Sequence, residues 1–134
     1  DEMAGHYRDA GITRVVSVES RGFLTGGALA CKLGAGIVPV RKTGKLPADT
    51  YSVSYDLEYG QDTLHIHRDA LSDQDVVLLH DDLLATGGTA LAAIELVRLF
   101  HVKQLYLSFL IELDALEGRS RLAPFGEVFT LIHL

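Results

Sequence analysis

The sequence contains only one cysteine, Cys31, among its 134 residues. A disulfide within the chain is therefore excluded, and a reducing compartment such as the cytoplasm is favoured. We expect Cys31 to be a core residue, because it lies in the apolar stretch 28–33 and small thiols are commonly buried. No apolar run approaches the roughly 20 residues that a membrane-spanning helix needs, so no membrane partner is expected.

Positive charge is in the minority, with 12 Lys and Arg against 18 Asp and Glu and a net charge of −6. This balance argues against a nucleic-acid binder held by bulk electrostatics, although it permits a local anion site. An apolar content of 48% with 22% charged residues excludes a disordered segment or a fibre. The length suits one domain covering residues 1–134.

Three common catalytic signatures are missing. A P-loop requires a lysine after its last glycine, whereas Gly88 is followed by Thr89. The dinucleotide-binding fingerprint requires a third glycine, which the pair Gly34 and Gly36 lacks, and no serine lies in a G-x-S-x-G turn. ATP hydrolysis, hydride transfer and serine hydrolysis are therefore disfavoured.

Apolar segments alternate with turn residues along the chain, and this pattern predicts an α/β fold. A helix capped by Thr25 and ended by Gly34 is expected after the first strand, and a buried helix over 90–100. Strands alternating with helices predict a doubly wound, mostly parallel sheet flanked by helices. The expected strands are 12–18, 37–41, 76–79, 105–113 and 128–134, with an extended ribbon at 51–67.

In sheets of this kind ligands bind beyond the carboxyl ends of the strands. The strongest candidate there is a loop with two glycines and two threonines at the start of a helix: Ala85, Thr86, Gly87, Gly88 and Thr89. Glycines let the backbone approach an anion, and the helix start directs free N–H groups and its positive dipole end toward it. We predict a phosphate site; the alternative is a tight turn with a capping threonine.

Other charged residues at predicted strand ends extend this site. The adjacent carboxylates of Asp81 and Asp82 would repel a phosphate but suit ribose hydroxyls or a magnesium shell. One loop would then hold a ribose 5-phosphate. Four cations lie at predicted strand ends: Arg21, Arg41, Lys42 and Lys45. They suggest a site for a polyanion such as pyrophosphate, and the alternative is a solvated basic loop. His80 beside the acidic pair could titrate or simply pack, and we assign it no catalytic role.

Several segments resemble a known family. The run 77–89, VLLHDDLLATGGT, resembles the phosphoribosyl-pyrophosphate motif of the type I phosphoribosyltransferases. Four more segments are similar to the adenine phosphoribosyltransferase family, in the same order: ESRGF at 19–23, VRKTGKLP at 40–47, YDLEYG at 55–60 and FLIEL at 109–113. The resemblance covers nearly the whole chain.

This resemblance implies the type I phosphoribosyltransferase fold and an enzyme of purine salvage. Its members transfer the 5-phosphoribosyl group of phosphoribosyl pyrophosphate (PRPP) to N9 of adenine with Mg²⁺, and they release AMP and pyrophosphate. It also implies a cytoplasmic homodimer, in which Arg41 and Lys45 reach pyrophosphate from a neighbouring subunit. We further expect a non-proline cis peptide in the turn 19–21.

The resemblance also assigns roles to residues. The loop 85–89 would hold the 5-phosphate, and Asp81 and Asp82 the ribose hydroxyls, with magnesium carried near them by PRPP and no direct protein ligand. Glu58 and Tyr59 would lie on a mobile catalytic loop at about 43–60, where Glu58 would contact the purine near N7 and manage its proton. The pyrophosphate would face Ser20, Arg21, Arg41, Lys42 and Lys45.

The sequence departs from the family pattern, and the first departure keeps an inactive fragment open as an alternative. The family carries a further N-terminal stretch, a hood that helps to bind adenine, and we expect that hood to be missing from this sequence. His80 stands where an aliphatic residue is usual. The alternatives are a PRPP-binding, purine-responsive regulator, although no DNA-binding segment is visible, or an inactive fragment of the same fold.

Overall fold

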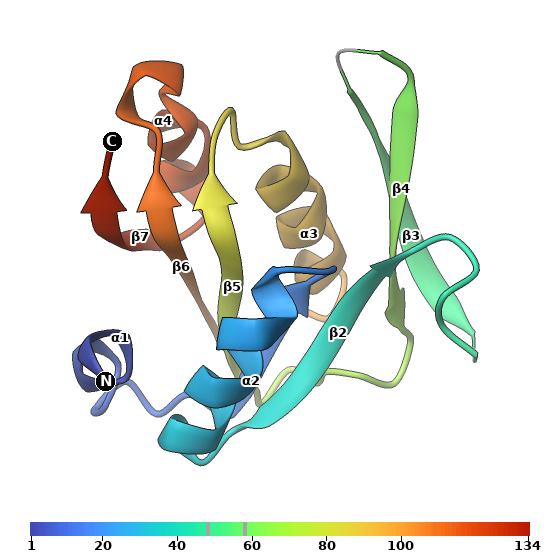
Figure 1. The fold of residues 1–134 in the computed structure, drawn as a ribbon. Helices are drawn as coiled ribbons and strands as arrows, with labels where there is room; N and C mark the ends of the chain where they lie inside the picture. The colour runs from blue at the N-terminus through green and yellow to red at the C-terminus, as the bar shows by residue number, and fades with distance from the viewer. Residues whose placement is uncertain (48, 58) are drawn as a thin grey trace.

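A twisted seven-stranded sheet runs through the molecule in the order β3-β4-β2-β1-β5-β6-β7 (Figure 1). The computed structural model describes residues 1–47, 49–57 and 59–134. Five strands are parallel: β1 (Arg14–Val18), β2 (Gly36–Lys42), β5 (Val76–Leu84), β6 (Gln104–Glu112) and β7 (Glu127–His133). The antiparallel ribbon of β3 (Thr50–Asp56) and β4 (Gln61–His67) joins the edge of β2. The predicted mostly parallel sheet is confirmed.

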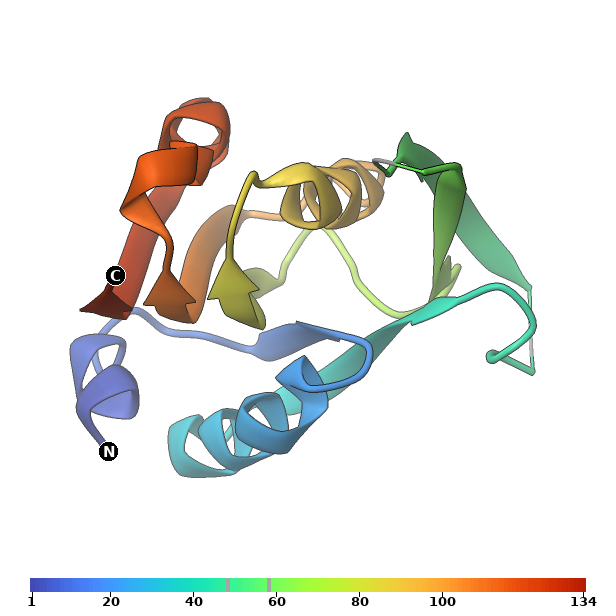
Figure 2. The ribbon, with the colours of Figure 1, turned by 45° about the horizontal axis from the view of Figure 1, so that its top comes forward.

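Helices cover both faces of the parallel strands, as Figure 2 shows. On one face lie α1 (Glu2–His6) and α2 (Gly22–Leu33), and on the other α3 (Gly88–Arg98) and α4 (Gly118–Leu122). Short 3₁₀ turns at Asp114–Leu116 and Ala123–Phe125 flank α4. No helix in the described part of the chain has both the length and the apolar character to cross a bilayer.

Strand β5 is central because it pairs with β1 on one side and β6 on the other. Its aliphatic residues alternate between two cores: Val77 and Leu79 pack on the α3 side, and Leu78 on the side of α1 and α2. The strand continues to Leu84 instead of ending at Leu79 as predicted, because its pairing with β6 persists to that residue. The acidic pair therefore lies on the strand itself.

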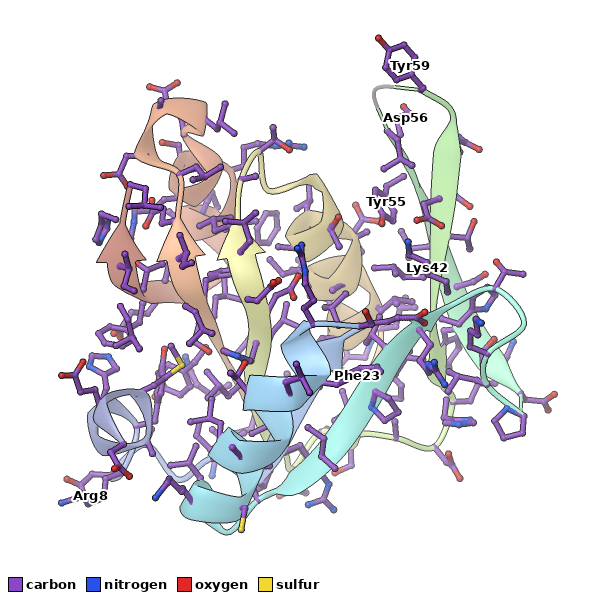
Figure 3. The ribbon with its side chains drawn as sticks, in the orientation of Figure 1. Arg8, Phe23, Lys42, Tyr55, Asp56 and Tyr59 are labelled. Carbon is purple, nitrogen blue, oxygen red and sulfur yellow. The ribbon has the colours of Figure 1, made fainter. Side chains whose placement is uncertain are left out.

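Alternate residues of β3 pack one face of the β3–β4 ribbon against α3. Tyr51, Val53 and Tyr55 are partly buried against the core beneath α3, whereas the serines between them are exposed. The ring of Tyr51 packs edge-on against Phe100 at 5.4 Å between centroids. Beyond this base the ribbon projects from the body of the molecule, and Tyr59 near its tip is 88% exposed (Figure 3).

The structure corrects two expectations for α2. The helix begins at Gly22, ahead of Thr25, and it ends at Gly34, whose φ of 65° gives the predicted left-handed cap. Cys31 is exposed, so its assignment to the core was wrong. The buried face of α2 includes Leu29 and Ala30, and successive residues of a helix are turned by about 100°, which carries the thiol to the solvent side.

Candidate functional site

A cleft of about 240 Å³ opens at the carboxyl ends of β1, β2 and β5. It lies where a doubly wound sheet is expected to bind ligands. Most of the predicted site residues line it together: Ser20, Arg21, Lys42, Asp81, Asp82, Ala85, Thr86, Gly87, Gly88 and Thr89. Predicted residues from three separate parts of the sequence therefore meet in one place.

The loop 85–89 joins β5 to α3 and presents its backbone to the cleft. Gly87 is the N-cap of α3 with a φ of 90°, a left-handed conformation that favours glycine. Within the described ranges, the N–H groups of Thr86, Gly87, Gly88 and Thr89 form no hydrogen bond. Unpaired amides at a helix start, together with the helix dipole, form a site for an anion.

The acidic pair sits beside this loop at the end of β5. Asp82 forms an ion pair with Arg21, with 2.9 Å between Oδ2 and Nε. Asp81 accepts a hydrogen bond from the backbone N–H of Asp82 at 2.8 Å, and burial raises the pKa of Asp81 to about 7. A side chain at Gly22 would lie 2.7 Å from an oxygen of Asp81, so the start of α2 lies close to this carboxylate.

The turn between β1 and α2 borders the cleft on its other side. The peptide bond between Glu19 and Ser20 is cis, which confirms the expectation for this turn. The Oε1 atom of Glu19 accepts hydrogen bonds from the Lys42 backbone N–H at 3.0 Å and from Arg41 Nε at 3.3 Å. The Lys42 N–H and the Arg41 guanidinium hold the pKa of Glu19 below its usual value.

The remaining predicted cations and ribbon residues are placed differently. Lys42 lines the cleft and pairs with Asp62 at 3.1 Å, and this carboxylate raises the pKa of the lysine. Arg41 is bound to Glu19 and lies over the ring of Phe23, so it stands outside the cleft lining, as does the exposed Lys45. Tyr59 is also outside it, and Glu58 lies outside the described residues.

Comparison with known proteins identifies the family. A family model described as "Phosphoribosyl transferase domain" matches residues 2–127. The adenine phosphoribosyltransferase of Bacteroides fragilis is 60% identical over 119 residues, which make up 89% of this chain and 67% of that protein. This chain belongs to the adenine phosphoribosyltransferase family.

Solved structures of the adenine phosphoribosyltransferase family share the fold. The Giardia lamblia enzyme, solved with 9-deazaadenine, has a TM-score of 0.94 and 45% identity, covering 99% of this chain and 76% of that one. The Trypanosoma brucei enzyme, solved with AMP, pyrophosphate and ribose-5-phosphate, has a TM-score of 0.87 and 26% identity, covering 98% of this chain and 61% of that one. The type I phosphoribosyltransferase fold is thereby confirmed.

His80 is fully buried beside the acidic pair. Its Nε2 lies 2.7 Å from Thr25 Oγ1, and its Nδ1 lies 2.9 Å from Ser108 Oγ. Burial lowers the pKa of His80 to about 4, so the ring is neutral near pH 7. Its contacts join α2 to β5 and β6, which is a packing role.

Sequence reasoning missed three residues around the cleft. Tyr55 lines it from β3, and Thr89 Oγ1 lies 3.5 Å from the Tyr55 hydroxyl. Gly118 and Arg121, on α4, contact the loop from behind. The only sequence signal for the latter pair is a glycine followed by two arginines after the FLIEL segment, and this pattern indicates no contact with a loop more than 30 residues earlier.

Proposed function

We propose that this protein transfers the 5-phosphoribosyl group of PRPP to N9 of adenine and releases AMP and pyrophosphate, a reaction of purine salvage. One observation carries the proposal: the cleft combines a loop of unpaired amides, two carboxylates and two cations, Arg21 and Lys42. These groups match the phosphate, the ribose hydroxyls and the pyrophosphate of PRPP. Relatives solved with 9-deazaadenine, AMP and pyrophosphate support the same chemistry.

The loop 85–89 binds the 5-phosphate in this proposal. The N–H groups of Thr86 to Thr89 donate to the phosphate oxygens, and the start of α3 adds its positive dipole end. The carboxylates of Asp81 and Asp82 accept hydrogen bonds from the two ribose hydroxyls. The ribose is thus held at its phosphate end and on its hydroxyl face, which fixes C1 for the reaction.

The cations and Ser20 in the cleft stabilise the leaving group in this proposal. Breaking the bond between C1 and pyrophosphate builds positive charge on the ribose and negative charge on the departing oxygens. Ser20, Arg21 and Lys42 all line the cleft. Their positive charge and hydrogen bonds favour the separated charges over the intact substrate, which lowers the barrier.

Magnesium fits the donor set of this site. Asp81 and Asp82 supply carboxylate oxygens, the ligand class that Mg²⁺ prefers, although Asp82 also pairs with Arg21. We propose that the ion arrives on PRPP and lies near this pair, with no direct protein ligand. When bound, magnesium neutralises part of the pyrophosphate charge.

The ribbon supplies the groups that act on the base. Glu58 contacts adenine near N7, and its carboxylate accepts the proton that the purine loses as N9 forms the bond to C1. Tyr59 follows Glu58 in the sequence. The tip turns through a hydrogen bond from the Leu57 N–H to the Gly60 carbonyl, 2.9 Å long. The segment at about 43–60, which includes β3, closes over the cleft and excludes water that would otherwise hydrolyse the ribosyl cation.

The protein acts as a cytoplasmic homodimer in this proposal. Arg41 and Lys45 lie outside the cleft lining of their own chain, and we propose that they reach pyrophosphate bound by the neighbouring subunit. Cys31 is an exposed free thiol, which suits a reducing compartment.

An activity assay tests this function. The protein is incubated with magnesium, PRPP and either adenine, hypoxanthine or guanine, and nucleotide and pyrophosphate are measured by chromatography. We expect AMP and pyrophosphate in equal amounts with adenine. Binding of PRPP without any product would support a purine-responsive regulator or an inactive fragment instead. No binding of PRPP would contradict the assignment of the cleft.

A further inference from the structure

The phosphate-binding loop is supported from behind by α4. Arg121 Nη1 donates a hydrogen bond to the Thr86 carbonyl at 2.9 Å. A side chain at Gly118 would collide with the Ala85 carbonyl and would lie 2.9 Å from Leu84 Cδ1, so the two backbones are in close contact. Neither Gly118 nor Arg121 lines the cleft. The loop is therefore enclosed between the cleft on one side and α4 on the other.

These contacts fix the direction of two amides. In a trans peptide the C=O and N–H groups point in opposite directions. Because the Thr86 carbonyl is bound by Arg121, the N–H of Gly87 points away from α4. Because the Ala85 carbonyl faces Gly118, the N–H of Thr86 also points away from α4. Both N–H groups are unpaired among the described residues, and both belong to residues that line the cleft.

Helix α4 is anchored to the sheet by contacts that do not involve the loop. Arg119 pairs with Glu112 of β6 at 2.7 Å and donates to the Val128 carbonyl of β7, also at 2.7 Å. Thr130 donates to the same carboxylate at 3.1 Å. Glu112 is buried, and the hydrogen bond from Arg119 holds its pKa below the usual value. This anchoring gives Arg121 a fixed place from which to bind the loop.

We propose that Arg121 is a positioning residue, which holds the Thr86–Gly87 peptide so that its N–H is aimed at the 5-phosphate before the ligand arrives. Donors that are oriented in advance bind without reorganisation, so losing this orientation weakens binding. The inference rests on the proposed function, because it takes the loop 85–89 as the phosphate site. It predicts a defect confined to the phosphate end of the substrate.

The first test compares Arg121→Met with Arg8→Met, a matched loss of one exposed arginine far from the cleft (Figure 3). Calorimetry measures the affinity for ribose 5-phosphate and, separately, for magnesium pyrophosphate. Arg121→Met weakens ribose 5-phosphate binding about tenfold, the effect of one hydrogen bond to a charged group. Pyrophosphate binding stays within about twofold, and Arg8→Met changes neither affinity. Arg121→Lys recovers most of the lost affinity for ribose 5-phosphate, because an ammonium group can donate to the same Thr86 carbonyl.

Salt separates positioning from simple charge attraction. About 0.5 M salt screens an exposed charge acting over a distance, whereas a hydrogen bond that orients a peptide persists. We expect the defect of Arg121→Met to remain at that salt concentration and to appear as a raised KM for PRPP with kcat near the original value.

Four results would overturn the proposal. They are an unchanged affinity of Arg121→Met for ribose 5-phosphate, an equal loss for both ligands, a defect that disappears in salt, and a failure of Arg121→Lys to recover binding. If the unaltered protein binds no ribose 5-phosphate, the proposed function fails as well. A defect in Arg121→Met alone leaves that function intact.

Discussion

The loop 85–89, where we propose that the 5-phosphate binds, and the tip of the β3–β4 ribbon are supported in opposite ways. The loop joins the central strand β5 to α3 and is supported by α4 from behind. The ribbon is held at its base by α3 and by two pairs with β2, Arg41–His65 and Lys42–Leu64, while Tyr59 near its tip is 88% exposed. Under the proposed function, the 5-phosphate of PRPP would meet backbone supported from behind, whereas the base would meet a projecting element.

The largest expected effect comes from breaking the fixed loop. Replacing Gly87 by valine abolishes binding of ribose 5-phosphate, because a β-branched residue is strained at a φ of 90° and its Cβ would lie 3.3 Å from the Gly118 carbonyl. The side chain would push the loop off α4. Calorimetry measures the binding, and circular dichroism checks that the sheet remains folded.

Gly11→Val is the matched control for that variant. Gly11 has a φ of 73°, and a side chain there would meet no atom within 4 Å. The backbone strain is similar, roughly 1–2 kcal/mol, but the position is remote from the cleft lining. We expect binding to survive in Gly11→Val. An unchanged affinity in Gly87→Val would contradict the role of the loop.

A change in the ribbon affects chemistry and leaves phosphate binding intact. Glu58→Gln lowers kcat about 100-fold, the range for loss of a general acid or base, while the dissociation constant for PRPP stays the same. Asp56→Asn, the loss of a nearby exposed ribbon carboxylate, is the control and keeps kcat within about twofold. Single-turnover kinetics and PRPP titration provide the two readouts. If Glu58→Gln weakened PRPP binding as much as it lowered kcat, the ribbon and the loop 85–89 would not have separate roles.

The smallest effect concerns stability at the fixed region. Burial raises the pKa of Asp81 to about 7, whereas an unfolded aspartate ionises near pH 4. The folded state therefore binds more protons between these values, and stability falls as the pH rises from about 4 to 7. Asp81→Asn removes this penalty and raises the melting temperature by about 3 to 6 °C at pH 8, although it weakens PRPP binding.

Thermal denaturation at pH 8 and pH 4.5 checks this sign. The difference between Asp81→Asn and the unaltered protein shrinks at the lower pH, where the carboxyl is protonated in the folded state. Protonation of His80 as the pH falls toward 4 is common to both proteins and cancels in the comparison. If Asp81→Asn melted at a lower temperature than the unaltered protein at pH 8, the Asp81 carboxylate would stabilise the fold, contrary to this prediction.

Local patterns in the sequence were sufficient to predict most of the fold. Aliphatic runs and glycine-rich turns placed the parallel strands and the loop 85–89, because each of these features is encoded within a few neighbouring residues. The end of β5 was missed because the turn-like residues after Leu79 are held in the strand by pairing with β6. Cys31 was misplaced because an apolar stretch does not reveal which of its residues faces the sheet.

The contacts that complete the site could not be predicted in the same way. Arg121 and Thr86 are 35 residues apart, and their contact depends on how Arg119 anchors α4 to β6 and β7. No periodicity or motif in the sequence encodes such an arrangement. The family resemblance supplied Ser20 and the cis peptide before it, which composition alone would not suggest.

The central place of β5 also governs how the protein loses activity. From Val77 to His80 this strand pairs with both β1 and β6, so we expect hydrogen exchange of that part to require opening of the sheet. Asp81 and Asp82 belong to the same strand. We expect the ribbon, at the edge of the sheet, to open by local fluctuation more readily than β5. Under the proposed function such opening would stop turnover while Asp81 and Asp82 keep their places. Heat inactivation would then precede the melting of the core.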